Sequence, residues 1–271
     1  MRVLLASTDS DLLRATEFSL ECRGYKVTLL MPKRAIAAQL SESGADIIVL
    51  DVEFSRTRTA AIVERLKDDQ KYAGIVLILL SRSRTQLQKA CPDRKVLNKA
   101  DYVLVEMFDE SDIINRIESA ARFLRTEGAQ YHKEGHDRAD PYAANSRRER
   151  RRDKRFPLDT QIAVRGKDVL GEPFEEQTTM TNIGAEGACL KTEFHLDNGA
   201  DLEMSIRDPQ APDGTFDIRG TVLRTEIGGN KHEPKRRRVA VRFVDDVKQN
   251  TEFRLFIARL ANSAEKTDRA R

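Results

Sequence analysis

Two hydrophobic patterns divide the chain near its middle. In the first half, apolar runs of strand length alternate with segments whose apolar residues recur at helical spacing. The runs are continuous rather than alternating, which predicts strands that are buried on both faces, as in a parallel sheet between helices. The predicted strands are Val3–Ala6, Tyr25–Leu30, Asp46–Asp51, Ile75–Ser81 and Asp101–Glu106.

Helical spacing fills the segments between and after these runs. The expected fold for residues 1–125 is therefore an α/β domain with a doubly wound, five-stranded parallel sheet. The predicted helices are Asp11–Cys22, Lys33–Ser43, Thr57–Asp68, Arg84–Leu97 and Ser111–Leu124.

After residue 155 the pattern changes to short strands in which apolar and polar residues alternate. Six such strands must close on themselves to protect their edges, which predicts an antiparallel β-barrel. A C-terminal helix, Val247–Leu260, has apolar residues at helical spacing and is expected to pack over the barrel. The predicted strands are Leu158–Val164, Phe174–Thr181, Gly187–Thr192, Asp201–Ile206, Phe216–Thr225 and Arg238–Val244.

The domain boundaries follow from these patterns. Residues 126–146 are polar, contain Gly and Pro and lack a hydrophobic period, so they are assigned to a linker. The barrel and its helix occupy residues 147–262, and residues 263–271 are assigned to a disordered tail. In the linker, His132 and His136 lie four residues apart around Gly135. A solvated pair is favoured over a metal site there, and no metal is expected.

Composition restricts the class of protein. The chain has 271 residues, a mean hydropathy of -0.55 and three cysteines without CxxC spacing. No apolar run approaches the roughly 20 residues of a membrane span, so a cytoplasmic protein with reduced, packed cysteines is expected. The formal charge is only +3, but residues 145–155 hold six Arg and one Lys against one Glu and one Asp. This segment is the strongest local charge in the sequence.

The carboxyl ends of the first-half strands resemble the receiver domain of two-component signalling. Asp51 stands at the phosphoacceptor position and Ser81 at the position of the conserved hydroxyl. Ser7 and Thr8 stand where receivers have the acidic pair that holds Mg²⁺, and Glu106 stands where they have a Lys. The resemblance therefore implies a pseudo-receiver that does not accept a phosphoryl group, with Asp51 as a vestigial phosphoacceptor.

The physical reason lies in the charges. Mg²⁺ prefers anionic oxygens, for which hydroxyls are poor substitutes, and a Glu repels the phosphoryl oxygens that a Lys attracts. Asp9 and Asp11 are expected to cap and charge the first helix instead.

Two motifs in the second half resemble the PilZ domain. RRDKRFPL precedes the first barrel strand, and TNIGAEGACL follows the second. The family signature is RxxxR followed by (D/N)xSxxG. Arg151 and Arg155 match the first motif, and Asn182 and Gly187 match the second, while Gly184 replaces its Ser.

The resemblance implies that the protein binds cyclic di-GMP. Arg side chains suit a ligand with two phosphates and two guanines, because a guanidinium binds phosphate or guanine in a bidentate manner and also stacks. Arg152 adds charge beside the two motif arginines. Gly187 is expected where the backbone bends or approaches another strand, and Gly184 keeps only a backbone N–H in place of the Ser hydroxyl.

The function expected from these features is a cyclic di-GMP receptor whose ligand changes the domain arrangement and the surface offered to a protein partner. A ligand-independent adaptor, in which both domains are degenerate, is the alternative. Nucleic-acid binding through the basic segment is disfavoured because aromatic residues for base stacking are not interleaved with the charges. Neither half shows a catalytic motif, so an enzyme is not expected. The partner, the number of ligands bound and the oligomeric state, including a homo-oligomer, stay open.

Overall fold

The computed structural model describes residues 1–30, 44–55, 58–72, 74–131, 156–207, 215–227, 237–244 and 250–269. The chain divides into two compact units, one built on residues 1–131 and a second that begins at His132. The predicted helix Lys33–Ser43 lies outside the described residues, as do His132 and His136.

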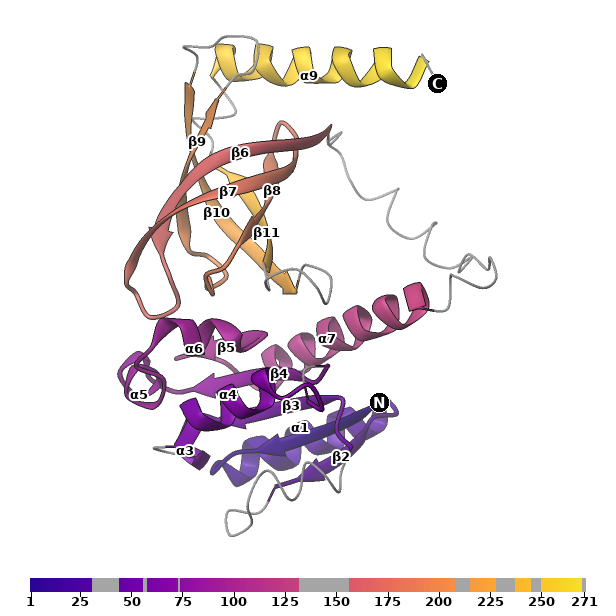
Figure 1. Ribbon diagram of the computed structural model, residues 1–271, viewed down its shortest axis with the longest axis vertical. Helices are drawn as coiled ribbons and strands as arrows, with labels where there is room; N and C mark the ends of the chain where they lie inside the picture. The colour runs from indigo at the N-terminus through magenta and orange to yellow at the C-terminus, as the bar shows by residue number, and fades with distance from the viewer. Residues whose placement is uncertain are drawn as a thin grey trace. The chain divides into compact units, whose positions relative to one another are not determined.

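The first unit is a five-stranded parallel sheet in the order β2-β1-β3-β4-β5, with helices packed against it (Figure 1). Its central strands β3 and β4 are buried along their whole length, because helices cover a parallel sheet on both sides. The doubly wound fold expected from the sequence is therefore confirmed. The strands are β1 Arg2–Ala6, β2 Lys26–Leu29, β3 Ile47–Asp51, β4 Val76–Ser81 and β5 Tyr102–Val105.

The described helices of this unit follow the prediction with one break. The segment Arg84–Leu97, expected as a single helix, forms α5 and α6, because Pro92 disfavours helical conformation at the residue before it. Asp9 caps the first helix as expected, since its carboxylate accepts a hydrogen bond from the Leu12 N–H at 3.0 Å. The helices are α1 Ser10–Cys22, α3 Val52–Ser55, α4 Thr59–Asp68, α5 Arg84–Ala90, α6 Arg94–Lys99 and α7 Glu110–Tyr131.

Helix α7 extends further than the sequence indicates. It continues to Tyr131 instead of ending near Leu124, so the first residues assigned to the linker are helical. The hydrophobic period ends where the helix stops packing on the sheet, and a polar continuation carries no such signal. The domain boundary predicted at residue 125 therefore moves to about residue 131.

The second unit is a closed barrel in the strand order β10-β11-β8-β7-β6-β9 (Figure 1). Every neighbouring pair is antiparallel, and β9 pairs with both β6 and β10 to close the circle. The predicted six-stranded barrel is confirmed. Its strands are β6 Phe156–Lys167, β7 Pro173–Ile183, β8 Gly187–Thr192, β9 Asp201–Arg207, β10 Thr215–Ile227 and β11 Arg237–Phe243.

Helix α9, Thr251–Arg269, packs its apolar face against this barrel. Phe253 is the centre of the contact: its ring lies 5.5 Å from that of Phe243 and 6.2 Å from that of Phe216, both in edge-on geometry. The helix also includes residues 263–269, so the predicted disordered tail is wrong for that segment.

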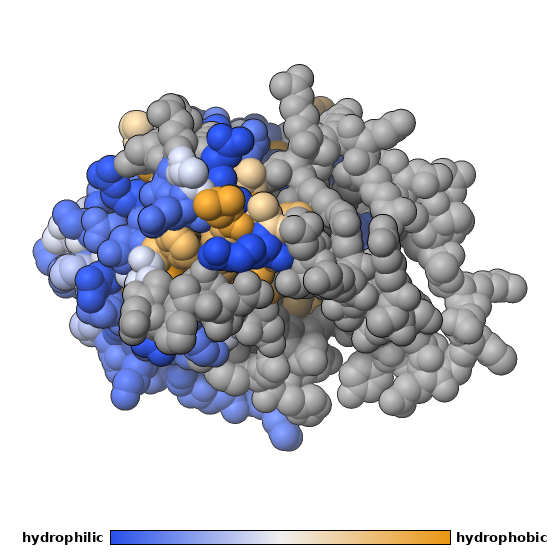
Figure 2. Space-filling view, turned by 90° about the horizontal axis from the view of Figure 1, so that it is seen from above, coloured by the Kyte–Doolittle hydropathy of each residue, from blue (hydrophilic) through white to orange (hydrophobic). Residues whose placement is uncertain are grey.

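The described surface is mainly polar. In Figure 2 most of the described residues in view are hydrophilic, with a small hydrophobic group between them. No helix in the described part of the chain combines the length and apolarity needed to cross a bilayer. Five large hydrophobic residues are exposed among the described ones: Met1, Phe18, Met107, Leu223 and Leu255.

The cysteines are free thiols, as expected, but only two are packed. Cys91 and Cys189 are buried, whereas Cys22 is exposed. Burial raises the pKa of the Cys91 thiol to about 11, so it stays protonated near neutral pH and is a poor nucleophile.

Replacing Phe253 by Ala is expected to detach α9 from the barrel. The ring is 1% exposed, so its removal should lower the free energy of unfolding of the barrel unit by about 3–5 kcal/mol. Urea unfolding of the full chain, with the units distinguished by hydrogen exchange, measures the loss. Leu255→Ala on the same helix is the control, since that side chain is 56% exposed and its loss should change little. Equal effects of the two substitutions would contradict the packing described above.

Candidate ligand-binding site on the barrel

The residues of the second predicted motif lie together in the hairpin that joins β7 to β8. The Gly184 N–H donates a hydrogen bond to the Gly187 carbonyl oxygen at 2.8 Å, which leaves Ala185 and Glu186 exposed at the tip. Asn182 lies on β7 one residue before the apolar Ile183. The turn itself therefore uses the backbone N–H that Gly184 keeps in place of the Ser hydroxyl.

A β-bulge determines where Asn182 lies. Met180 pairs with Leu190 and Asn182 pairs with Cys189, so Thr181 is an extra residue on β7. Met180 and Ile183 both belong to the barrel core although they are three positions apart. In a regular strand, residues two apart share a face, and Asn182 would lie on the same face as Met180. The bulge moves Asn182 to the outer face, where it is half-buried.

The side chain of the bulged residue, Thr181, makes a hydrogen bond to the neighbouring strand. The Thr181 hydroxyl donates to the Cys189 carbonyl oxygen at 3.1 Å, across the position where the ladder is interrupted. This hydrogen bond joins the bulge on β7 to β8. The outward position of Asn182 follows from the register of the two strands.

Gly187 is required by a close approach of two strands. A Cβ atom built on it would lie 2.2 Å from the Val241 carbonyl oxygen of β11. This is a backbone atom, so a change of side-chain rotamer cannot relieve the contact. The expectation of a close backbone approach at this residue is confirmed. A side chain at this position would separate β8 from β11.

The arginines of the first motif, Arg151, Arg152 and Arg155, lie outside the described residues. The strand that follows them is described from Phe156, which pairs with Ile183, while Pro157 pairs with Asn182. The chain therefore enters the barrel beside the Asn182 hairpin.

Two further cations on the barrel wall were not singled out from the sequence. Arg242 pairs with Gly187, and Arg238 pairs with Lys191. The alternation of Arg238, Ala240 and Arg242 with buried Val239, Val241 and Phe243 was visible in the sequence, but their proximity to the hairpin depends on strand order.

In the first unit, Asp51 is bonded within the protein on both carboxylate oxygens. The Ser7 hydroxyl donates to Oδ2 at 2.6 Å, and the Glu53 N–H donates to Oδ1 at 2.9 Å. Asp51 and Ser7 are both buried. The predicted vestigial phosphoacceptor thus lies at the carboxyl end of β3, as expected, and is held by the residue that replaces an acidic ligand.

The neighbouring groups at this edge of the sheet are also engaged. The buried Ser81 hydroxyl donates to the Ser83 carbonyl oxygen at 2.8 Å. Arg82 lies over the Phe108 ring, 4.3 Å from its centroid, and donates to the Phe108 carbonyl oxygen at 2.9 Å.

Glu106 at the end of β5 has a φ of 68°, which is uncommon for a residue other than Gly. Its carboxylate forms an ion pair with Arg84 at 3.4 Å. A cation elsewhere in the unit thus approaches the position where receivers carry a Lys, but it neutralises Glu106.

This arrangement does not fit Mg²⁺. Ser7 and Thr8 offer neutral oxygens, and the carboxylate that would bind the ion already accepts two hydrogen bonds. Among the described residues, no group of three or more His, Cys, Asp and Glu side chains could hold a metal ion.

The barrel segment can be compared with known families on this basis. Residues 149–259 match the family model of the PilZ domain. The match covers both motif arginines, the hairpin, all six strands of the barrel and the start of α9. No curated protein matches the sequence.

Solved structures show similarity to parts of the chain. The inhibitor of motility MotI/DgrA of Bacillus subtilis is 20% identical over 42% of this chain and 53% of that chain, with a TM-score of 0.31. The PilZ domain with c-di-GMP of YcgR from Escherichia coli is 18% identical, covering 44% and 98%, with a TM-score of 0.33. A signal receiver domain of a response regulator from Bermanella marisrubri is 20% identical, covering 44% and 97%, with a TM-score of 0.36. This chain spans about half the length of MotI/DgrA.

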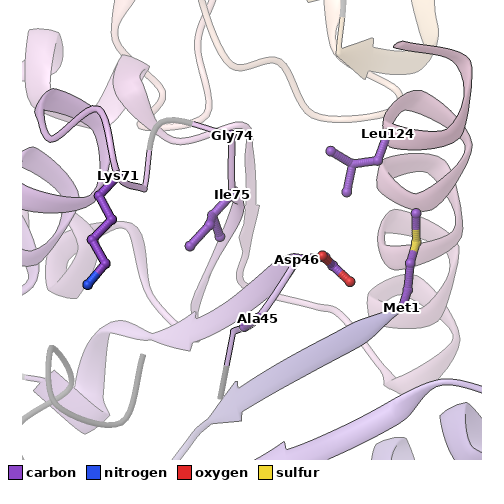
Figure 3. A pocket seen from close by; sticks show the side chains of 7 residues that line it. All are labelled: Met1, Ala45, Asp46, Lys71, Gly74, Ile75 and Leu124. Atoms are coloured by element: carbon purple, nitrogen blue, oxygen red, sulfur yellow. The ribbon is translucent and has the colours of Figure 1, made fainter. Parts of the chain in front are cut away.

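A cavity of about 350 Å³ lies in the first unit (Figure 3). Met1, Asp46 and Ile75, which precede β1, β3 and β4, contribute to its wall. The cavity is therefore at the amino ends of the strands, whereas Asp51 lies at a carboxyl end. In doubly wound folds ligands bind at the carboxyl ends, and no role is assigned to this cavity.

Gly187→Ala is expected to destabilise the barrel unit, because its methyl group would meet the Val241 carbonyl oxygen. The strands must shift to relieve this contact, at a cost of about 1–3 kcal/mol in the free energy of unfolding. Gly74→Ala is the control, since a Cβ there meets no atom within 4 Å. Urea unfolding of the two variants makes the comparison, and a Gly187→Ala variant as stable as the unmodified protein would contradict the close approach.

Proposed function

We propose that the protein is a cyclic di-GMP receptor, not an enzyme, and that the ligand binds between the arginine segment and the Asn182 hairpin. The observation that carries the proposal is the register of β6 and β7. Phe156, the residue after Arg155, pairs with Ile183, and Asn182 is turned to the outer face by the bulge. The two motifs are thus joined to neighbouring positions on one rim of the barrel.

The chemistry of these residues suits the ligand. Arg151 and Arg155 supply planar forks for a phosphate or for the O6 and N7 atoms of guanine, and Arg152 adds positive charge. The Asn182 amide offers both donors and an acceptor to a guanine edge or a ribose. The missing side chain of Gly187 keeps the strands beneath the site in contact.

Gly184 removes one hydroxyl from the family's pattern. A neutral hydrogen bond contributes about 0.5–1.5 kcal/mol net, so its loss weakens binding by roughly tenfold or less. The remaining contacts include charge-assisted ones, which are stronger, and the site keeps useful affinity without the hydroxyl.

The proposed mechanism starts from the arginine segment, residues 147–155, which directly precedes β6. The ligand orders residues 147–155 against the barrel wall, and this changes the arrangement of the two units and the surface that a partner protein reads. The signal is thus carried by a binding equilibrium and not by a chemical reaction.

Calorimetry with cyclic di-GMP tests the proposal. The unmodified chain should bind, and Arg151→Ala/Arg155→Ala should weaken binding about a hundredfold or more, because each Arg makes charge-assisted hydrogen bonds of about 1.5–3 kcal/mol. Arg165→Ala is the matched control: it lies near the other end of β6 and pairs with Glu175 at 3.0 Å. An absence of heat at high micromolar ligand would rule the proposal out, as would undiminished binding by the double variant.

Small-angle scattering of the same full-length samples tests the rearrangement separately. Saturating ligand should change the profile of the unmodified chain and leave that of the double variant as it was. Binding without any change in scattering would retain the receptor and remove the rearrangement.

The contacts of Asp51 support an interaction role for the first unit. A receiver whose phosphoacceptor is bonded to Ser7 and to the Glu53 N–H can still present its helices to a partner. If the PilZ domain did not bind the nucleotide, the whole chain would act as an adaptor through such surfaces.

Incubation with acetyl phosphate and Mg²⁺ is expected to leave the mass of the protein unchanged, because the site lacks the anionic ligands that Mg²⁺ requires. Intact-mass spectrometry measures this, and a known active receiver serves as the positive control. A mass gain of one phosphoryl group that disappears in Asp51→Ala would show that the receiver is functional.

A further inference from the structure

We propose that the outer wall of β8 and β11 is a third part of the cyclic di-GMP site, and that Arg242 contacts the ligand from it. This inference rests on the proposed function and adds residues that neither motif contains. It starts from the strand register, which brings β11 beside the Asn182 hairpin although the two are far apart in sequence.

Alternation shows which side chains face outward. On β11, Val239, Val241 and Phe243 belong to the core, so Arg238, Ala240 and Arg242 face away from it. On β8, Ala188 and Leu190 belong to the core, so Cys189 and Lys191 face outward.

The register places these outward residues in rows. Cys189 pairs with Ala240 on one side and with Asn182 on the other. Lys191 pairs with Arg238 and Gly187 with Arg242, which gives one row on each side of the Cys189 row. Arg242 therefore belongs to the row nearest the hairpin turn.

Residues with small side chains occupy the middle of this wall. Cys189 is 7% exposed and Ala240 is 8% exposed, and Gly187 has no side chain. Arg238 and Arg242 flank Ala240 on β11 and lie about 13 Å apart along the strand. Cys189 and Ala240 are covered by their neighbours, so a purine ring would approach this wall at the exposed Arg242 side chain.

Three cations lie on this wall: Lys191, Arg238 and Arg242. No carboxylate in the described part of the chain forms an ion pair with Lys191, Arg238 or Arg242. Glu226 lies directly opposite Arg238 in the register of β10 and β11, and its carboxylate forms an ion pair with Arg224 at 3.5 Å. Three cations on one wall favour an anionic ligand, and the guanidinium groups of the two arginines can also stack on a flat ring; cyclic di-GMP has both features.

Arg242 also accounts for a gap in the motif. Gly184 lacks the Ser hydroxyl, and its N–H is used within the turn. A guanidinium from the adjacent strand supplies a charge-assisted hydrogen bond on the same side of the ligand.

Calorimetry of three single variants tests this assignment. Arg242→Gln should weaken cyclic di-GMP binding about tenfold or more, since a charge-assisted bond is lost. Lys191→Gln, farther from the turn, should have a smaller effect. Arg207→Gln is the matched control, because Arg207 is also exposed but lies on β9, on the opposite side of the barrel.

Ala240→Trp tests the middle of the wall without removing a charge. The side chain faces away from the core but is only 8% exposed, so circular dichroism and thermal unfolding first establish that the variant folds, and the folded variant should not bind the ligand. Equal affinity in Arg242→Gln, Ala240→Trp and the unmodified chain would overturn the inference and leave the receptor function intact. If the unmodified chain does not bind cyclic di-GMP, both fail.

Discussion

The extra residue in β7 is the constraint on which the barrel site depends. Without Thr181, the alternation of the strand would turn Asn182 toward the core that Met180 occupies, and a polar amide would need partners among apolar side chains. Because of the bulge, Met180 and Ile183 both face the core while Asn182 faces outward. The hydrogen bond from Thr181 to the Cys189 carbonyl oxygen stabilises the bulge. The outward position of Asn182, on which the proposed site depends, therefore originates in a backbone irregularity.

Much of the architecture could be predicted because its signals are local. Continuous apolar runs identified the parallel strands, alternation identified the barrel strands, and the residue types at strand ends indicated the altered receiver site. The ends of α7 and α9 could not be predicted in this way, because both helices continue through segments whose sequence has no hydrophobic period. The break between α5 and α6 could have been predicted from Pro92, because proline disfavours helical conformation at the residue before it. One residue can thus interrupt a segment whose hydrophobic period is helical.

The site was only partly predictable, since its geometry depends on pairing between distant segments. Asn182 and Gly187 were found from their motif, whereas the outward turn of Asn182 and the position of Arg242 follow from register. Gly187 shows the difference: the sequence suggested a close approach, but only the strand order identified the Val241 carbonyl oxygen as its cause. A motif thus specifies residue types, and pairing specifies which of them meet.

The hydrogen bond between Ser7 and Asp51 has a consequence for timing. A working receiver keeps a covalent record of a past event until hydrolysis erases it. With Asp51 held by its neighbours, the proposed receptor would keep no such record and would respond only to the present concentration of its ligand. The response would then decay at the rate of ligand dissociation, without a phosphatase.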